Sequence, residues 1–139
     1  MEEKKRATLT QRLAWVQTQL KAPKDQYNQF GKYSYRTAAG ILQAAKPLIS
    51  QPGIDLMITL SDEMVEVGGR VYLKATAAAV DIYTGEKIEV TGMAREDETK
   101  AGMAGAQITG SCSSYARKYA LCGLLMIDDS SLDPDNGKA

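Results

Sequence analysis

The stretch that decides the fold is residues 54–95, IDLMITLSDEMVEVGGRVYLKATAAAVDIYTGEKIEVTGMAR. At its start, every second residue is apolar, which is typical of a strand with one buried face: Ile54, Leu56, Ile58 and Leu60. Gly68-Gly69 is a two-residue loop of the kind that favours a tight hairpin, and Thr84-Gly85-Glu86 makes a second turn. The sequence therefore predicts a three-stranded antiparallel meander.

The pattern also sets the boundaries of the three strands. We expect the first strand to begin at Ile54, to bend near Ser61-Asp62 and to resume as far as Val67. Residues 70–83 form the next strand. The last strand runs from Lys87 to Arg95, with alternate apolar positions facing inward: Ile88, Val90 and Ala94.

A helix and a loop are predicted at the N-terminal end. Residues 8–21 repeat apolar side chains at helical spacing, with Thr8 or Thr10 able to cap the start and Pro23 ending the helix. Residues 22–36, APKDQYNQFGKYSYR, are polar, aromatic and basic at once. This composition suits an ordered surface loop better than a core element.

Two further helices complete the prediction. Thr37 caps the first of them, and Gln51-Pro52-Gly53 stops it. A long helix spans Gly102 to Ile127, because apolar residues step by four and three along one stripe: Ile108, Cys112, Tyr115, Tyr119, Cys122 and Met126. The N-terminal half of this helix is rich in small residues, which permit very close approach by a neighbour: Ala104, Gly105, Ala106, Gly110, Ser111, Ser113 and Ser114.

These elements predict an α+β fold, in which a three-stranded antiparallel β-meander is packed by the long C-terminal helix and preceded by two N-terminal helices. With 139 residues, the chain has the size of one domain, which we assign to residues 1–127. Residues 96–101 are charged and are expected to form a flexible connection. Residues 128–139 form an acidic tail without apolar pattern, which is expected to be disordered.

Composition excludes several classes of protein. Because the chain has no histidine, histidine-dependent catalytic triads and histidine-ligated metals are excluded. No run approaches the ~18 consecutive apolar residues of a membrane span, so we expect a cytoplasmic protein with no membrane partner. The Gly-rich run at 102–111 lacks the lysine of a phosphate loop, and Cys112 and Cys122 match no zinc pattern. We therefore expect no metal, no cofactor and no enzyme activity.

The net charge of zero hides an asymmetry. Residues 1–46 carry nine Lys or Arg against three acids, which leaves a charge of +6. The last twelve residues carry four Asp against one Lys, which gives a charge of −3. A basic front and an acidic tail are expected when one end of a protein meets a polyanion.

Two segments combine aromatic and basic residues. In the loop, rings interleave with cations, as single-stranded nucleic acid requires: Tyr27, Phe30, Lys32, Tyr33, Tyr35 and Arg36. The same tyrosines could instead cover the core. Near the end of the chain, Arg117 and Lys118 lie beside Tyr115 and Tyr119, where they could line a phosphate-tracking groove or be solvated cations. The strand cations carry the same ambiguity: Arg70, Lys74 and Arg95.

The chain resembles a known family at two segments. These are NQFGKYSYRTAAGILQAAKPLI at residues 28–49 and GAQITGSCSSYARKYALCGLLMIDD at residues 105–129. Both look like the signature regions of the Erf (essential recombination function) family of phage annealing proteins. The resemblance implies ATP-independent binding and annealing of single-stranded DNA in phage-type homologous recombination, in the bacterial host cytoplasm. It also implies a fold similar to that of the eukaryotic annealing mediators.

The resemblance extends to partners and site residues. It implies a homo-oligomer, as a ring or helical filament with DNA along a basic groove; a single-strand-binding protein or an exonuclease is a further candidate partner. Carried over by position, the first signature supplies Lys32, Tyr33, Tyr35 and Arg36, and the second supplies Tyr115, Arg117 and Lys118. Lys74 and Arg95 join them as exposed cations of the strands.

Two other classes of function remain open. A protein-interaction adaptor without direct DNA binding would use the small-residue helix as a docking face, and its binding would depend little on salt. A nuclease would need a buried cluster of carboxylates to hold metal, and none is visible at readable spacing.

Overall fold

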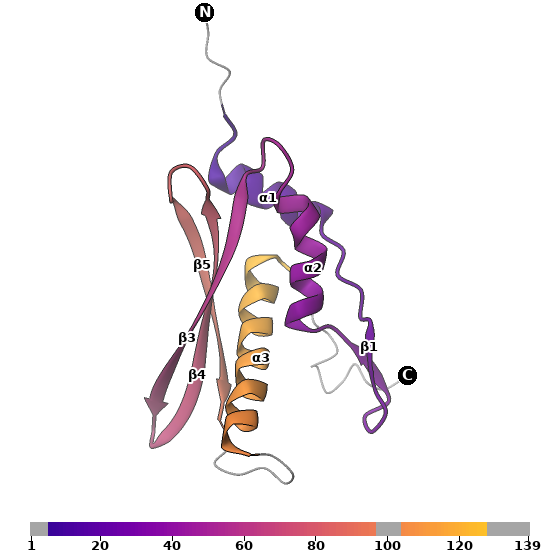
Figure 1. The fold of residues 1–139 in the computed structure, drawn as a ribbon, viewed down its shortest axis with the longest axis vertical. Helices are drawn as coiled ribbons and strands as arrows, with labels where there is room; N and C mark the ends of the chain where they lie inside the picture. The colour runs from indigo at the N-terminus through magenta and orange to yellow at the C-terminus, as the bar shows by residue number, and fades with distance from the viewer. Residues whose placement is uncertain (1–5, 97–103, 128–139) are drawn as a thin grey trace, which may run out of the picture.

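The structure is a computed structural model, and it describes residues 6–96 and 104–127. A three-stranded antiparallel sheet carries the helix α3 on one face, with α1 and α2 toward one end and a small β-hairpin on the far side of α3 (Figure 1). The elements in chain order are α1 (Leu9–Gln19), β1 (Gln26–Asn28), β2 (Tyr33–Tyr35), α2 (Ala38–Ile49), β3 (Leu56–Val67), β4 (Arg70–Asp81), β5 (Lys87–Arg95) and α3 (Gly105–Leu124). The predicted α+β fold is confirmed.

The sheet has the order β3-β4-β5, so the predicted meander is also confirmed. The predicted bend near Ser61-Asp62 is wrong, because these two residues pair in unbroken register with Thr76 and Ala75. β4 ends at Asp81, two residues earlier than predicted. Its carboxylate accepts the backbone N–H groups of the next turn, which ends the strand there.

The close seating of α3 on the sheet depends on small residues. A Cβ atom at Gly92 of β5 would lie 2.5 Å from the backbone nitrogen of Ala120 and 2.7 Å from the carbonyl oxygen of Ala116, so only glycine fits there. At Gly123 a Cβ would lie 2.7 Å from Cγ1 of Val90. The helix backbone can therefore approach the strands closely.

The predicted apolar stripe of α3 is partly wrong. Tyr115, Tyr119 and Met126 are exposed, whereas smaller or later residues form the buried face with Ile108 and Cys112: Ala116, Ala120, Leu121 and Leu124. Because the helix lies so close to the sheet, alanines fill the contact and the bulky tyrosines are left at its flanks. The small residues of the N-terminal half do not explain this packing, since a Cβ at Gly105 or Gly110 would meet nothing within 4 Å.

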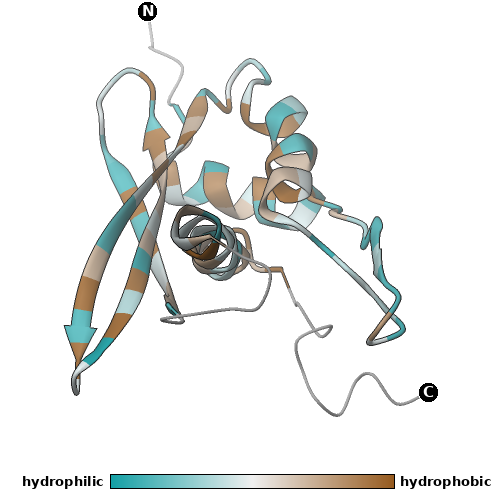
Figure 2. Cartoon of the chain, turned by 60° about the horizontal axis from the view of Figure 1, so that its bottom comes forward, coloured by the Kyte–Doolittle hydropathy of each residue, from teal (hydrophilic) through white to brown (hydrophobic). Residues whose placement is uncertain are grey.

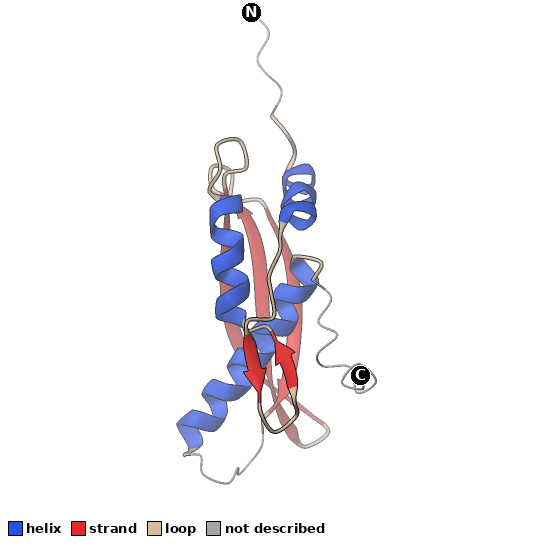
Figure 3. Ribbon diagram, turned by 90° about the vertical axis from the view of Figure 1, so that its right-hand side faces the viewer, coloured by secondary structure: helices blue, strands red, loops and turns tan. Residues whose placement is uncertain are grey.

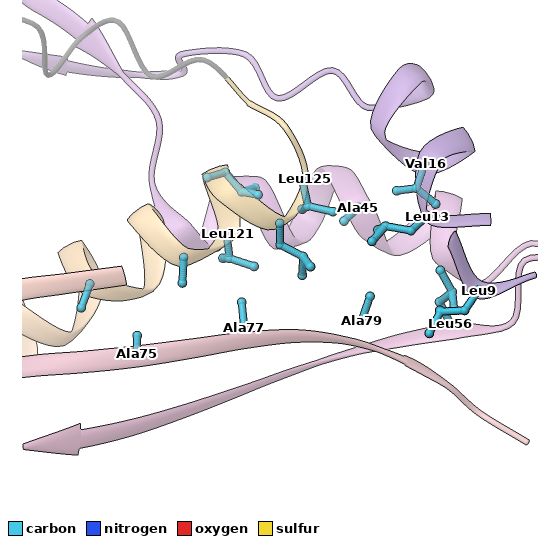
Figure 4. Close-up of a cluster of buried hydrophobic side chains, with 14 of the residues drawn as sticks. Leu9, Leu13, Val16, Ala45, Leu56, Ala75, Ala77, Ala79, Leu121 and Leu125 are labelled. Atoms are coloured by element: carbon cyan, nitrogen blue, oxygen red, sulfur yellow. The ribbon is translucent and has the colours of Figure 1, made fainter. Parts of the chain in front are cut away.

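The hydrophobic core lies between the sheet, α3 and the two N-terminal helices. Figure 4 shows alanines of β4 facing leucines of α3, with residues of α1 closing one end. Thr8, and not Thr10, caps α1 through a capping box with Gln11. Thr37 caps α2 as predicted, and α2 ends at Ile49, just before the expected stop.

The segment predicted as a surface loop is in fact a β-hairpin. β1 and β2 pair from Gln26↔Tyr35 to Asn28↔Tyr33. The side-chain oxygen of Asn28 accepts the N–H groups of Phe30 and Gly31 and so closes the turn. Strands of three residues are too short to show an alternating pattern in the sequence. The predicted flexible connection (apart from Glu96) and acidic tail lie outside the described residues.

A buried ion pair ties α1 to the end of β4. Nη2 of Arg12 donates to the carboxylate of Asp81. The other two guanidinium nitrogens, Nε and Nη1, donate to the carbonyl oxygens of Ala7 and Ile54. The side chains of Arg12 and Asp81 are each only 4% exposed. The Arg12 guanidinium and two backbone N–H groups hold the pKa of Asp81 well below its usual value.

Candidate nucleic-acid interface

A cavity of about 210 Å³ lies between the start of α2 and the middle of α3. Viewed nearly along α3, the helix lies between the sheet on one side and the hairpin on the other (Figure 2). The cavity is lined by residues of both sequence segments that carry the family resemblance: Tyr35, Arg36, Thr37, Ala38, Ser111, Ser114, Tyr115 and Lys118. Four of the predicted site residues therefore meet at one place, although they are distant in the chain.

Lys118 is the most buried cation of this cavity. Its side chain lies beside two aromatic rings, with the ammonium nitrogen 5.6 Å from the centroid of Tyr35 and 5.9 Å from that of Tyr115. The residue is 3% exposed, so its reading as a solvated cation is wrong. A buried ammonium needs compensating partners, and the faces of two tyrosines supply part of that compensation.

A second cavity, of about 390 Å³, adjoins the first on the β5 side of α3. Ser111 and Tyr115 line both cavities, so Tyr115 stands between them. Arg95 and Tyr119 line the second cavity together with Met93 and Cys112. The two cavities together form a track with the cations Arg36 and Lys118 on the side of the first cavity and tyrosines along it. Arg95 borders the second cavity from β5, but its side chain alternates with Ala94 and Gly92 and so points to the face of the sheet opposite α3.

The hairpin beside this track presents aromatic and basic side chains to solvent. Phe30 at the turn is fully exposed and Tyr27 is 59% exposed, so neither covers the core. Lys32 is also exposed. Tyr33 and Tyr35 are half-buried and pack edge to face, with ring centroids 5.9 Å apart. Figure 3 shows the hairpin standing in front of α3 when the molecule is viewed from that side.

Arg117 does not join the track. Its guanidinium donates to both carboxylate oxygens of Asp62 on β3, at 3.0 and 3.1 Å, and Ser113 donates to the same carboxylate at 2.7 Å. Burial alone would raise the pKa of Asp62, but the hydrogen bonds from Arg117 and Ser113 outweigh it and hold that pKa below its usual value. Neighbouring positions on a helix point about 100° apart, so Arg117 and Lys118 face different elements.

Lys74 also lies away from the track. Ala75 of β4 pairs with Gly92, which faces α3, so the preceding residue Lys74 points to the opposite face of the sheet. Two cations of the predicted basic front are likewise occupied within the chain. Arg12 is the buried partner of Asp81, and Arg6 lies over the ring of Tyr83, 4.4 Å from its centroid, while it pairs with Asp55.

Sequence reasoning missed the two serines of the first cavity. Ser111, Ser114, Tyr115 and Lys118 follow the spacing i, i+3, i+4, i+7, which places all four on one helix face. The spacing of these four residues can be read in the sequence. It was missed because the face of the helix was assigned from the apolar stripe through Tyr115 and Tyr119. Ser111 and Ser114 add hydroxyl donors, which suit phosphate oxygens.

Within residues 6–96 and 104–127, no three side chains of the metal-binding types cluster together. No helix in the same ranges has the length and apolar content to cross a membrane.

Comparison with known proteins gives one clear relationship. The chain is 51% identical over 120 residues to the essential recombination function protein of Salmonella phage P22. The matched region covers 86% of this chain and 55% of the phage protein. The chain thus spans about half the length of the curated relative that it matches. No solved structure matches, so the expected likeness to the eukaryotic mediators stays a prediction. The family described as the ERF superfamily matches residues 9–139, and the chain belongs to this family.

Proposed function

We propose that this protein binds single-stranded DNA along the two-cavity track and anneals complementary strands without ATP, as a step of phage-type homologous recombination. The observation that carries the proposal is the meeting of Tyr35 and Arg36 with Tyr115 and Lys118 around one cavity. Tyrosine rings can stack on bases, and the cations can neutralise phosphates. The printed name of the phage P22 relative supports the recombination setting.

Annealing needs no chemical step, because base pairing supplies the free energy. The protein has to hold a strand extended and reduce the repulsion between phosphates. One copy offers a short track with few cations. Repeating that track in a homo-oligomer, as a ring or a filament, would lengthen the site and make binding cooperative. A cytoplasmic protein without cofactor or catalytic group is sufficient for this activity.

The main test is annealing of two complementary labelled oligonucleotides without nucleotide, comparing the native protein with Lys118→Met. Methionine keeps the length of the side chain and removes its charge. We expect the variant to bind single strands at least about tenfold more weakly, because a charge-assisted phosphate contact is worth about 1.5–3 kcal/mol. The melting temperature of the variant, followed by circular dichroism, checks that its fold is kept.

The matched control for this test is Arg117→Met, which removes a cation one residue away that is occupied by Asp62. It should retain most of the DNA affinity. If the native protein neither binds single strands nor speeds annealing at low salt, the proposal fails. A native protein that binds a partner protein with little salt dependence would instead support the adaptor.

A second prediction concerns the exposed hairpin. Lys32→Ala should lower the affinity for single strands and reduce the slope of log K against log salt by about 0.7, the value for one phosphate contact on a single strand. Lys46→Ala is the matched control, since Lys46 is exposed but lies in the last turn of α2, away from the cavity at its start. Equal slopes for the two variants would remove the hairpin from the DNA site.

A further inference from the structure

Both outer strands of the sheet have an open edge. β3 and β5 pair only with β4 among the described residues. β3 is 12 residues long and β5 is 9, and both pair with β4 in unbroken register, without a bulge. Neither strand contains proline. Long, regular edges of this kind present a row of unpaired backbone groups, and they form a template for another strand.

The register shows which backbone groups of β3 point outward. Just before β3 begins, Ile82 donates its N–H to the carbonyl oxygen of Asp55, so these two residues form a hydrogen-bonded pair. In an antiparallel ladder every second pair is hydrogen-bonded, so the odd-numbered residues of β3 bond to β4. The alternate residues of β3 therefore direct their N–H and C=O groups to the open edge: Leu56, Ile58, Leu60, Asp62, Met64 and Glu66.

The same argument applies to β5. Asp81 donates to Glu86 at 2.8 Å, and Glu96 donates to Val71 at 2.9 Å, so the even-numbered residues of β5 bond to β4. The open edge of β5 is formed by the odd-numbered residues: Lys87, Glu89, Thr91, Met93 and Arg95. No backbone hydrogen bond outside the sheet reaches either edge within the part of the chain that the structure describes.

The two edges differ in charge. β3 contains three acids and no Lys or Arg, and Glu63 and Glu66 stay exposed after Arg117 has engaged Asp62. β5 contains two cations and one acid, and the acid Glu89 pairs with Lys87, which leaves Arg95 as the excess charge. Exposed methionines lie on both strands, with Met64 on β3 and Met93 on β5.

The charges of the two edges and the directions of β3 and β5 determine how the sheet of a second copy can pair with this sheet. Two β3 edges joined by a two-fold axis would bring acids together, and two β5 edges paired about Thr91 would set Lys87 opposite Arg95. Like charges that face each other across strands are destabilising. An acidic β3 edge against a basic β5 edge avoids this. Because β3 and β5 run in the same direction within the sheet, such a joint is parallel when the α3 helices of both copies lie on the same face.

We propose that the β5 edge of one copy of this chain pairs with the β3 edge of the next, so that the sheets of successive copies form one continuous sheet. Each joint uses one β5 edge and one β3 edge, so the two ends of the assembly always carry one free edge of each kind. The contact therefore repeats, and the assembly either closes into a ring or grows as a filament. The cavity on the β5 side of α3 would then border the next copy, and the track would continue from copy to copy. The β5 edge and the second cavity share Met93 and Arg95, so assembly is tested without DNA to keep the two proposals separate.

The test uses proline to cap one edge at a time. Met64→Pro removes an outward N–H of β3, and Thr91→Pro removes an outward N–H of β5; neither removes a bond to β4. Met64→Ala and Thr91→Ala change the same side chains but keep the N–H groups, so they are the matched controls. Masses are measured by analytical ultracentrifugation without DNA, and circular dichroism checks the fold of each variant.

We expect the native protein and both alanine variants to assemble, and each proline variant to be monomeric. An equal mixture of the two proline variants should give a 1:1 dimer, because one supplies an open β3 edge and the other an open β5 edge. A monomeric native protein would overturn the proposal. So would a proline variant that assembles by itself, or a mixture that stays monomeric.

Hydrogen exchange tests the proposal without any substitution, and so stays informative if a proline variant fails to fold. The outward amides of Leu60 and Thr91 should exchange at least about tenfold more slowly at high than at low protein concentration. Equal rates at both concentrations, with assembly still present by mass, would place the interface elsewhere. Because neither experiment contains DNA, failure of the edge pairing is distinguishable from failure of strand binding and annealing, which the oligonucleotide assay measures.

Discussion

Replacing Asp81 by asparagine is expected to lower the melting temperature by about 10 °C or more, because it leaves a buried charge without its partner. The asparagine oxygen can still accept the N–H groups of Tyr83 and Thr84, so the turn keeps its cap. The Arg12 guanidinium, however, loses the only carboxylate with which the described structure pairs it. Thermal unfolding followed by circular dichroism at pH 7 measures the change.

The control is the double variant Arg12→Met/Asp81→Asn. Because both charges are then absent, much of the lost stability should return. A single variant that melts within about 2 °C of the native protein would show that the pair contributes little.

The ion pair of Arg12 and Asp81 also predicts how stability depends on acid pH. Since the folded pKa of Asp81 is lowered, its contribution is present above the ordinary value of 3.8 and is lost as the pH falls below it. Asp81→Asn should lack this part of the acid sensitivity.

Replacing Gly92 by alanine is expected to cost about 3 kcal/mol of folding free energy, at the upper end of the usual range for overpacking. The new Cβ would lie 2.5 Å from the backbone nitrogen of Ala120 and 2.7 Å from the carbonyl oxygen of Ala116. These are backbone atoms of α3, so no side-chain rotation relieves the contact and the helix must move away from the sheet. Urea denaturation measures the loss.

Gly110→Ala is the matched control, since the same change is made within α3 where nothing lies within 4 Å of the new Cβ. Alanine is the better helix former, so this variant should gain about 0.5–1 kcal/mol. Opposite signs for the two variants would establish that the contact at Gly92 is steric. If Gly92→Ala is neutral, α3 does not lie as close to β5 as the structure indicates.

Much of the fold could be predicted from the sequence, because its strands are long and its turns are marked. Gly68-Gly69 fixed one hairpin, and the last strand was predicted with its observed ends, Lys87 and Arg95. The hairpin of β1 and β2 escaped prediction, because three-residue strands carry no readable period. The buried face of α3 was misjudged for another reason: side-chain size favoured Tyr115 and Tyr119, while close packing selected Ala116 and Ala120.

The candidate site was predicted in composition but not in arrangement. The first signature pointed to Tyr35 and Arg36, and the second to Tyr115 and Lys118, and the structure brings these four together. Arg117 could not be separated from Lys118 by sequence alone, because its partner Asp62 lies 55 residues earlier, on β3. Whether a cation is occupied within the chain depends on such distant contacts.

α3 follows the three strands in the chain, and this order affects how the protein folds while it is being synthesised. The three strands are joined by short turns, so their contacts are local and can form as soon as about 95 residues have been made. The helix that covers the sheet is completed only at Leu124. Until then the growing chain exposes the apolar sheet face that α3 later covers, beside edges that stay open in the folded chain, and this combination favours aggregation. Ribosome-bound chains that stop before α3 should therefore bind chaperones, whereas chains with α3 outside the ribosome should bind them less.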